Sequence, residues 1–276
     1  MNREKVLKII NDSTDLGGKE FKPSIRAVYV ADNNGDLSHL GSCVLLSINQ
    51  ENYLLTAAHI VDKAQKATLY INGTANELVC INGLFMITNK PELGRDADHY
   101  DFAWLHLSDK LIELCGKDDF ITEERLIEGA ESSEGIIYLA LGYPCSKNEP
   151  NRFKKTISPN YFRYADMVKS DKKLCQKLGI SGADHLFLNY NFKHSKNERG
   201  FLINAIKPQG LSGGALVDMG TIADWNKPGF KAVGKLAGLI IEGHKDHKVV
   251  VAVKMNNIVN SIKQKQTKDA KRNSGI

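Results

Sequence analysis

The sequence predicts an all-β fold, a barrel or a sandwich, with a short helix near each end. Many short runs rich in Val, Ile, Leu and aromatic residues are separated by turn-forming Asn, Gly and Asp, which is typical of antiparallel sheets. The chain has 276 residues, of which 42% are hydrophobic and 25% charged, and these ordinary proportions exclude a disordered or collagen-like chain. This length is sufficient for one large domain or two small ones.

The expected elements fall into two groups of strands. An amphipathic helix is expected over residues 3–12, and a second helix over residues 256–265 follows the last strand. A polar stretch at residues 118–133 separates the two groups. Residues 146–182 are polar and rich in lysine, with helical spacing around 167–178, and we interpret them as a surface excursion or a substrate-facing loop. The expected strands are residues 25–31, 42–48, 53–56, 68–71, 77–81 and 102–107, then 135–143, 186–192, 201–205, 214–219, 231–241 and 249–253.

The formal net charge of +5 is concentrated near the C-terminal end of the sequence. From residue 263 onward there are five basic side chains and one acidic side chain, so the rest of the chain is nearly neutral. Phosphate recognition requires a basic face on the folded part of a protein, and we therefore expect no nucleic-acid partner. Residues 266–276 are interpreted as a frayed, solubilising basic tail.

Hydropathy and cysteine usage indicate a cytoplasmic protein. No apolar run approaches the roughly 20 residues that cross a membrane, so no membrane partner is expected. The first ten residues are basic, but the apolar core and cleavage site of a secretory signal do not follow them. There are five cysteines, an odd number, and no Cys-x-x-Cys pair, which favours reduced thiols.

Three short segments carry side chains suited to nucleophilic catalysis. They read Tyr-Leu-Leu-Thr-Ala-Ala-His at residues 53–59, Tyr-Asp-Phe-Ala-Trp-Leu-His-Leu at residues 100–107, and Gly-Leu-Ser-Gly-Gly at residues 210–214. A serine hydroxyl such as that of Ser212 is a weak nucleophile until a base accepts its proton. His59 suits that role near neutral pH. Asp101, at the start of a buried run, is expected to orient the imidazole and to stabilise its charged form.

The glycine turn around the serine also predicts an oxyanion hole. Gly210 has no Cβ, so its backbone can adopt a positive φ and direct its N–H group at a developing negative charge. The N–H groups of Gly210 and Ser212 are the expected donors. Taken alone, each segment also fits a plain structural role, as a glycine-rich turn or as a hydrogen-bonded core histidine.

The segments follow one another in the order His, Asp, Ser, and the sequence resembles the trypsin-like serine peptidases, also called chymotrypsin-like. The similarity also includes Gly-Ser-Cys-Val-Leu at residues 41–45 and Leu-Gly-Tyr-Pro at residues 141–144, and it extends over about residues 22–262. It implies a single peptidase domain with two antiparallel six-stranded barrels, over about residues 22–117 and 134–255. The resemblance further implies peptide-bond hydrolysis through an acyl-enzyme, a protein or peptide substrate, and no cofactor.

Departures from the family pattern bear on specificity and control. Ile206 stands six positions before the serine, where trypsins carry the acid that selects Lys or Arg, so the resemblance implies a small or apolar side chain at the cleaved bond. Glu242 and Gly243 lie on the strand expected to flank the substrate and complete the expected pocket. Leu211 replaces the acid that receives a new N-terminus during zymogen activation. Another form of control is then needed, and a latent peptidase activated by a protein partner is one hypothesis.

Several alternative interpretations are retained. A protease-like fold that serves as a non-catalytic binding or regulatory module would be marked by a broken triad. Asp98 is a second candidate for the triad acid, although only Asp101 adjoins the buried run. The cluster of Asp96, Asp98, His99 and Asp101 lacks the spacing of a calcium loop, and no metal is expected. Cys145 is interpreted as a buried, inert thiol.

Overall fold

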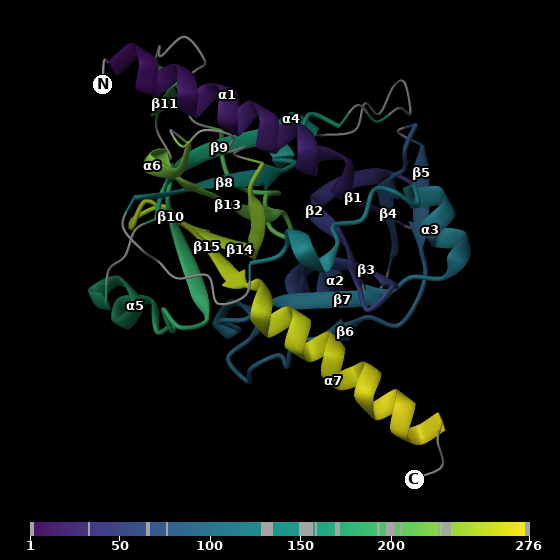
Figure 1. The fold of residues 1–276 in the computed structure, drawn as a ribbon. Coiled ribbons are helices and arrows are strands. Elements are labelled where there is room, and N and C mark those ends of the chain that lie inside the picture. Colours follow the sequence, from purple (N-terminus) through teal and green to yellow (C-terminus); the bar gives the residue numbers. More distant parts are fainter. Residues whose placement is uncertain are drawn as a thin grey trace.

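Two antiparallel β-sheets form the body of the protein, one from each half of the chain, as a computed structural model shows (Figure 1). The predicted all-β class, with its double-barrel arrangement, is confirmed. The structure describes residues 3–32, 34–64, 67–75, 77–127, 135–148, 157, 159–168, 172–191, 194–196, 202–204, 206–225, 227 and 233–273.

The first sheet has seven strands in the order β5-β4-β1-β2-β3-β7-β6, one more than expected. The additional strand is β6, a two-residue edge strand in which Met86 pairs with Trp104 of β7. A short helix, α2 (Ala58–Lys63), lies between β3 and β4, and another, α3 (Asp109–Cys115), follows β7. The strands are β1 (Ile25–Ala31), β2 (Leu37–Ile48), β3 (Glu51–Ala57), β4 (Thr68–Asn72), β5 (Leu78–Ile81), β6 (Met86–Ile87) and β7 (Phe102–His106).

The second sheet has six strands in the order β10-β15-β14-β13-β8-β9. A bridge between Val168, just after β9, and Leu188 of β10 connects the two edges of this sheet. A separate ribbon pairs β11 (His194–Lys196) with β12 (Leu202–Asn204). The six strands are β8 (Ile136–Gly142), β9 (Phe162–Met167), β10 (His185–Asn189), β13 (Ala215–Thr221), β14 (Lys235–His244) and β15 (Val249–Lys254).

Strand β9 corrects the interpretation of residues 146–182 as an excursion from the sheet. It pairs with β8 along its whole length, from Ile137 opposite Met167 to Gly142 opposite Phe162. Helix α5 (Lys172–Leu178) follows it, and α4 (Cys145–Asn148) precedes it. Residues 149–156, 158 and 169–171 of this stretch lie outside the described residues, as do residues 128–134 of the polar connection. The side chains of β9 are only partly buried, which is why its hydrophobic pattern is weak.

The helix near the N-terminus is longer than predicted. Helix α1 runs over Arg3–Phe21, 19 residues instead of ten, and continues through two glycines. A Cβ on Gly17 would lie 2.6 Å from the terminal methyl of Met219, so the glycine permits close packing on the second sheet. The helix ends where Pro23 begins a 3-10 turn, Lys22–Ser24.

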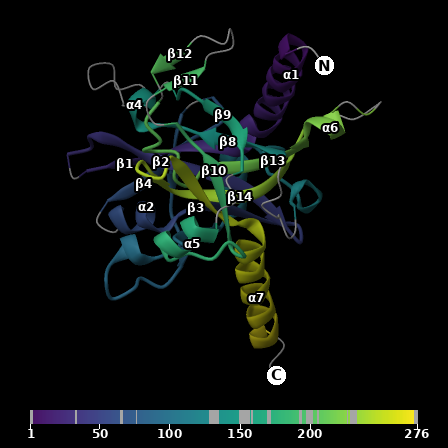
Figure 2. The same ribbon diagram turned by 90° about the vertical axis from the view of Figure 1, so that its left-hand side faces the viewer.

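Helix α7 also extends beyond its predicted end, over Met255–Asn273. Most of the expected basic tail is therefore helical, and residues 274–276 lie outside the described residues. Gln266 anchors this part, since its amide contacts the Asn49 side chain at 2.9 Å and the Glu51 carboxylate at 2.9 Å. The last turns of α7 project from the body at the end opposite to the start of α1 (Figures 1 and 2).

Apolar side chains fill each sheet and the space between the sheets. On β2, Cys43 and Leu45 face the interior of the first sheet, whereas Val44, Leu46 and Ile48 belong to a cluster shared with the second sheet and α7. A short helix, α6 (Ile222–Trp225), follows β13. No helix in the described ranges combines the length and the apolar character that crossing a membrane would require.

Candidate active site

His59 and Asp101 meet at the end of strand β3. His59 is the second residue of α2, and Asp101 directly precedes β7, which pairs with β3. Asp101 Oδ2 lies 2.6 Å from His59 Nδ1, and Asp101 Oδ1 accepts the His59 backbone N–H at 2.9 Å. Because a carboxylate only accepts hydrogen bonds, this contact assigns the ring proton to Nδ1 and leaves Nε2 as a base.

The Asp101 carboxylate is largely removed from water. The residue is only 6% exposed, and burial raises the pKa of Asp101, while the hydrogen bonds and charge of His59 lower it. Its backbone has a φ of +39°, a left-handed conformation that is uncommon outside glycine. Asp101 is therefore a constrained residue whose charge acts strongly on the adjacent imidazole.

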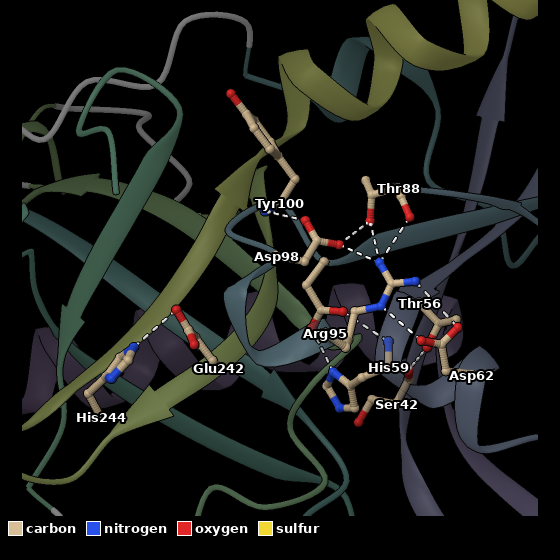
Figure 3. A network of polar contacts seen from close by, with 11 residues as sticks. Ser42, Thr56, His59, Asp62, Thr88, Arg95, Asp98, Tyr100, Glu242 and His244 are labelled. Atoms are coloured by element: carbon tan, nitrogen blue, oxygen red, sulfur yellow. Dashed lines mark hydrogen bonds and ion pairs between the residues drawn. The ribbon is translucent and has the colours of Figure 1, made fainter. Parts of the chain in front are cut away.

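A second polar cluster supports the loop that carries Asp101. Arg95 donates from Nε to Asp62 at 2.9 Å and from Nη1 to Asp98 at 2.5 Å, and the Thr88 hydroxyl donates to the same Asp98 oxygen (Figure 3). Burial alone would raise the pKa of Asp98, but these bonds and the N–H groups of Asp101 and Tyr100 hold it below its usual value. Asp98 is thus engaged away from His59, so Asp101, and not Asp98, is the carboxylate that contacts the imidazole.

Ser212 lies on a tight glycine turn that packs directly on the first sheet. Gly210 and Gly213 have φ values of +94° and +80°, and a Cβ on Gly213 would clash with the Ser42 carbonyl oxygen and the Thr56 hydroxyl. The turn is also fixed from its own sheet, because the Gly213 N–H donates to the carbonyl of Ile240 in β14 at 2.7 Å. Thr56 is three residues before His59, so the turn carrying the serine abuts the strand that leads into the histidine.

Ser42 of β2, which the sequence analysis did not single out, makes most of the contacts between the first sheet and this turn. Its N–H donates to the Ser212 carbonyl at 2.9 Å, and its hydroxyl donates to the Gly210 carbonyl at 2.8 Å. The same hydroxyl accepts the Tyr143 N–H at 2.8 Å, and the Ser42 carbonyl accepts the Thr56 hydroxyl (Figure 3). Ser42 is fully buried. The segment Gly-Ser-Cys at residues 41–43 belongs to the motifs that resemble the peptidase family and therefore pointed to this position. The contacts of Ser42 with the turn could not be predicted, because the turn lies far away in sequence.

These contacts leave two backbone N–H groups available. In the described part of the chain, neither the Gly210 N–H nor the Ser212 N–H donates to a backbone carbonyl, whereas the N–H groups of Leu211, Gly213 and Gly214 all do. The carbonyls of Gly210 and Ser212 are both held by Ser42, so the turn is fixed at the two residues that were predicted to form an oxyanion hole.

The residues predicted to line a substrate pocket are close to this turn, either in sequence or on the neighbouring strand β14. Ile206 is partly buried, and its carbonyl accepts the hydroxyl of the buried Tyr190 at 2.5 Å. Glu242 and Gly243 follow Ile240 and Ile241 on β14, the strand that is bonded to Gly213. Glu242 lies 3.0 Å from His244 Nε2, and the hydrogen bond with this carboxylate raises the pKa of His244.

The prediction that Cys145 is buried is wrong. The residue is half-buried, and its sulfur lies 3.3 Å from Nδ1 of the buried His39, next to Gly210. Burial lowers the pKa of His39 to about 4, so this imidazole is neutral at neutral pH and is a weak base toward the thiol. Among the described residues, no three His, Cys, Asp or Glu side chains gather as a metal site would require.

Comparison with solved structures identifies the fold. The serine endoprotease from Yersinia pestis matches 91% of this chain with a TM-score of 0.51 at 15% sequence identity. The HtrA-type protease AlgW with tripeptide gives a TM-score of 0.47 at 16% identity over 91% of this chain. The thermostable serine protease AL20 from an extremophilic microorganism gives 0.48 at 15% identity, covering 85% of this chain and 92% of its own. No protein-family model and no curated protein sequence matches the chain.

The match to the Yersinia pestis endoprotease supports an assignment of the fold. The chain has the fold of trypsin-like serine peptidases, as the sequence motifs predicted. It spans 65% of the length of that endoprotease and 62% of AlgW, so those two proteins contain further sequence that this chain does not match.

We predict that Ser42→Ala destabilises the protein more than a neighbouring serine replacement does. The change leaves the buried Tyr143 N–H and Gly210 carbonyl without their shared partner, at a cost of about 1–3 kcal/mol in the free energy of unfolding. Urea denaturation measures this difference. Ser47→Ala, at a partly buried position of the same strand, is the control, with an expected change within about 0.5 kcal/mol. Equal effects of the two changes would contradict the role given to Ser42.

Proposed function

We propose that this protein is a serine endopeptidase in which Ser212 is the nucleophile, His59 the general base and Asp101 the residue that orients the base. The observation that carries the proposal is the His59–Asp101 pair, joined by two hydrogen bonds, beside the glycine turn that presents Ser212. The shared fold supports the choice of peptide-bond hydrolysis over other acyl transfers.

The proposed reaction follows from the atoms at the site. Ser212 Oγ attacks the carbonyl carbon of the scissile bond while His59 Nε2 takes its proton, and the N–H groups of Gly210 and Ser212 stabilise the resulting oxyanion. His59 then gives the proton to the leaving amine, and an acyl-enzyme on Ser212 results. A water molecule, deprotonated by His59, hydrolyses the ester. The substrate is a protein or a peptide.

One feature of the site favours dependence on a partner or on substrate. Within the described residues the imidazole of His59 is bonded to Asp101, and no hydrogen bond joins its Nε2 to the Ser212 hydroxyl. Such contacts are often long before substrate binds. We propose that substrate, or an activating protein partner, brings these two groups into contact.

Labelling with a fluorophosphonate tests the nucleophile. The wild-type protein should form a covalent adduct on Ser212, and Ser212→Ala should abolish it. Asp101→Asn should slow labelling by about 10,000-fold, because the amide favours the wrong imidazole tautomer. Mass spectrometry of the labelled peptide gives the site. Labelling that appears only after addition of a cell extract would support a partner. The absence of labelling in both conditions would contradict the peptidase proposal.

The pocket residues predict cleavage after small or apolar side chains. No carboxylate stands at Ile206, and the charge of Glu242 is opposed by His244, so Lys and Arg should be poor residues at the cleaved bond. A peptide-library profile measures this preference. Ile206→Asp should raise the relative cleavage after Lys and Arg, whereas Leu93→Asp, on an exposed loop, should leave the profile unchanged. A wild-type preference for Lys or Arg would refute the assignment of this pocket.

We also propose that the protein works in the cytoplasm. The proposal is supported by its five cysteines, none of which forms a disulfide in the structure, although Cys43 and Cys115 are fully buried. Alkylation of the denatured protein from freshly lysed cells should modify all five thiols. A disulfide that survives in that sample would argue for an oxidising compartment.

A further inference from the structure

The imidazole of His185 is bonded to two backbone carbonyl groups. His185 is the first residue of β10 and is 1% exposed. Its Nδ1 lies 2.8 Å from the carbonyl oxygen of Ser181, and its Nε2 lies 2.6 Å from the carbonyl oxygen of His99. The first carbonyl belongs to the turn before β10, in the second half of the chain. The second belongs to the loop of the first half that carries Asp101.

These two contacts require a charged ring. A carbonyl oxygen has no proton, so each ring nitrogen must donate, and a neutral imidazole has only one N–H group. Only the imidazolium form satisfies both carbonyls. A neutral ring would leave one nitrogen lone pair against a carbonyl oxygen, which is unfavourable in a buried position.

The surroundings of His185 can accommodate a positive charge. The Tyr100 ring centroid lies 5.7 Å from the His185 ring, within the range of a cation–π contact. The Tyr100 hydroxyl donates to the carboxylate of Asp184 at 3.1 Å, so an anion lies on the adjacent residue. His99 and Asp98 lie on the same loop as Tyr100. The backbone N–H of Lys254 in β15 donates to the Asp184 carbonyl.

The backbone of His185 is held firmly by the second sheet. Its N–H donates to the Ser181 carbonyl at 3.0 Å, and β10 pairs it with Val253 of β15. The Asn257 side chain of α7 also donates to the Asp184 carbonyl, at 3.4 Å. His185 is thus a fixed point from which a side chain reaches across to the loop of the first half.

We propose that His185, as a buried imidazolium, is a positioning residue for the proposed triad. By holding the His99 carbonyl it fixes the loop two residues before Asp101, whose left-handed backbone needs support from both sides. The Arg95–Asp98 cluster supports this loop from the first sheet, and His185 supports it from the second. This role deepens the proposed function and rests on it.

The two carbonyl contacts couple the His185 ring to the position of Asp101. A ring with a single N–H group would lose one of these contacts, and the loop that carries Asp101 would be less firmly held. Replacement of the ring should therefore change the environment of His59, which is bonded to Asp101.

Nitrogen NMR of isotope-labelled protein reads the protonation directly and needs no turnover. We expect both ring nitrogens of His185 to carry protons at neutral pH, because each faces a carbonyl oxygen. A His185 ring with a single N–H at neutral pH would overturn the proposal.

Substitution tests the effect on the triad. His185→Gln should remain folded, shift the His59 Nδ1 proton resonance and slow fluorophosphonate labelling by about 10- to 100-fold. Tyr100→Phe keeps the aromatic ring but removes its hydrogen bond to Asp184, and it should have a smaller effect of the same sign. This variant takes the place of His185→Gln in the test if His185→Gln is unstable. His106→Gln, at a largely exposed position of β7, is the matched control.

The outcomes separate this proposal from the proposed function. An unchanged His59 resonance and labelling rate in both His185→Gln and Tyr100→Phe would overturn the positioning role. A further outcome is that the wild-type protein is never labelled, while His185 is doubly protonated and its replacement shifts the His59 resonance. In that case the peptidase proposal fails, but the role of His185 in holding the loop that carries Asp101 is supported.

Discussion

The backbone contact between β2 and the turn at residues 210–214 is the constraint on which the site depends. It joins the two sheets at the point where a histidine from one and a serine from the other must meet. The contact is possible only because residue 213 is glycine, since a side chain there would collide with Ser42 and Thr56. Hydrogen bonds from Ser42 to the carbonyls of Gly210 and Ser212 then fix the turn from the first sheet. Gly213 permits the close approach of the turn to the first sheet, and the hydrogen bonds of Ser42 fix the orientation of the turn.

Buried charge is the second determinant of the site. The Asp101 carboxylate loses most of its hydration and is compensated by the ring and the backbone N–H of one residue, His59. Such a group contributes little to stability, because desolvation offsets its attraction to the imidazole. What it provides is a strong local field on the histidine and a fixed tautomer. The neighbouring Asp98 is satisfied by Arg95 and Thr88, which keeps a second carboxylate close without leaving it unpaired.

The sequence predicted those parts of the molecule that have a local signature. His59, Asp101 and Ser212 stand in short motifs, and short apolar runs between turn residues predicted the all-β class. The double-barrel arrangement was implied by the resemblance to trypsin-like peptidases. Strand β9 was missed because its side chains are only partly buried, and α1 was predicted to end at residue 12, whereas its continuation through Gly17 depends on close packing against Met219. The contacts of Ser42 with Gly210 and of His185 with His99 could not be predicted from local patterns, because these partners lie 168 and 86 residues away.

The two sets of cross-sheet contacts act on opposite ends of the proposed triad. Ser42 ties the first sheet to the turn that carries the nucleophile, and His185 ties the second sheet to the loop that carries the acid. The imidazole of His59 lies between these fixed ends and is bonded to the acid alone. Because both sets of contacts cross between the sheets, a displacement of one sheet against the other would break them, so a change in the distance from His59 to Ser212 has to come from local movement of these two side chains. Consider a binding event that stabilises the conformation in which His59 Nε2 contacts the Ser212 hydroxyl by about 1.4 kcal/mol. Such an event raises the population of that conformation tenfold relative to the conformation without the contact. Control through this distance needs no zymogen ion pair, which agrees with the leucine at position 211.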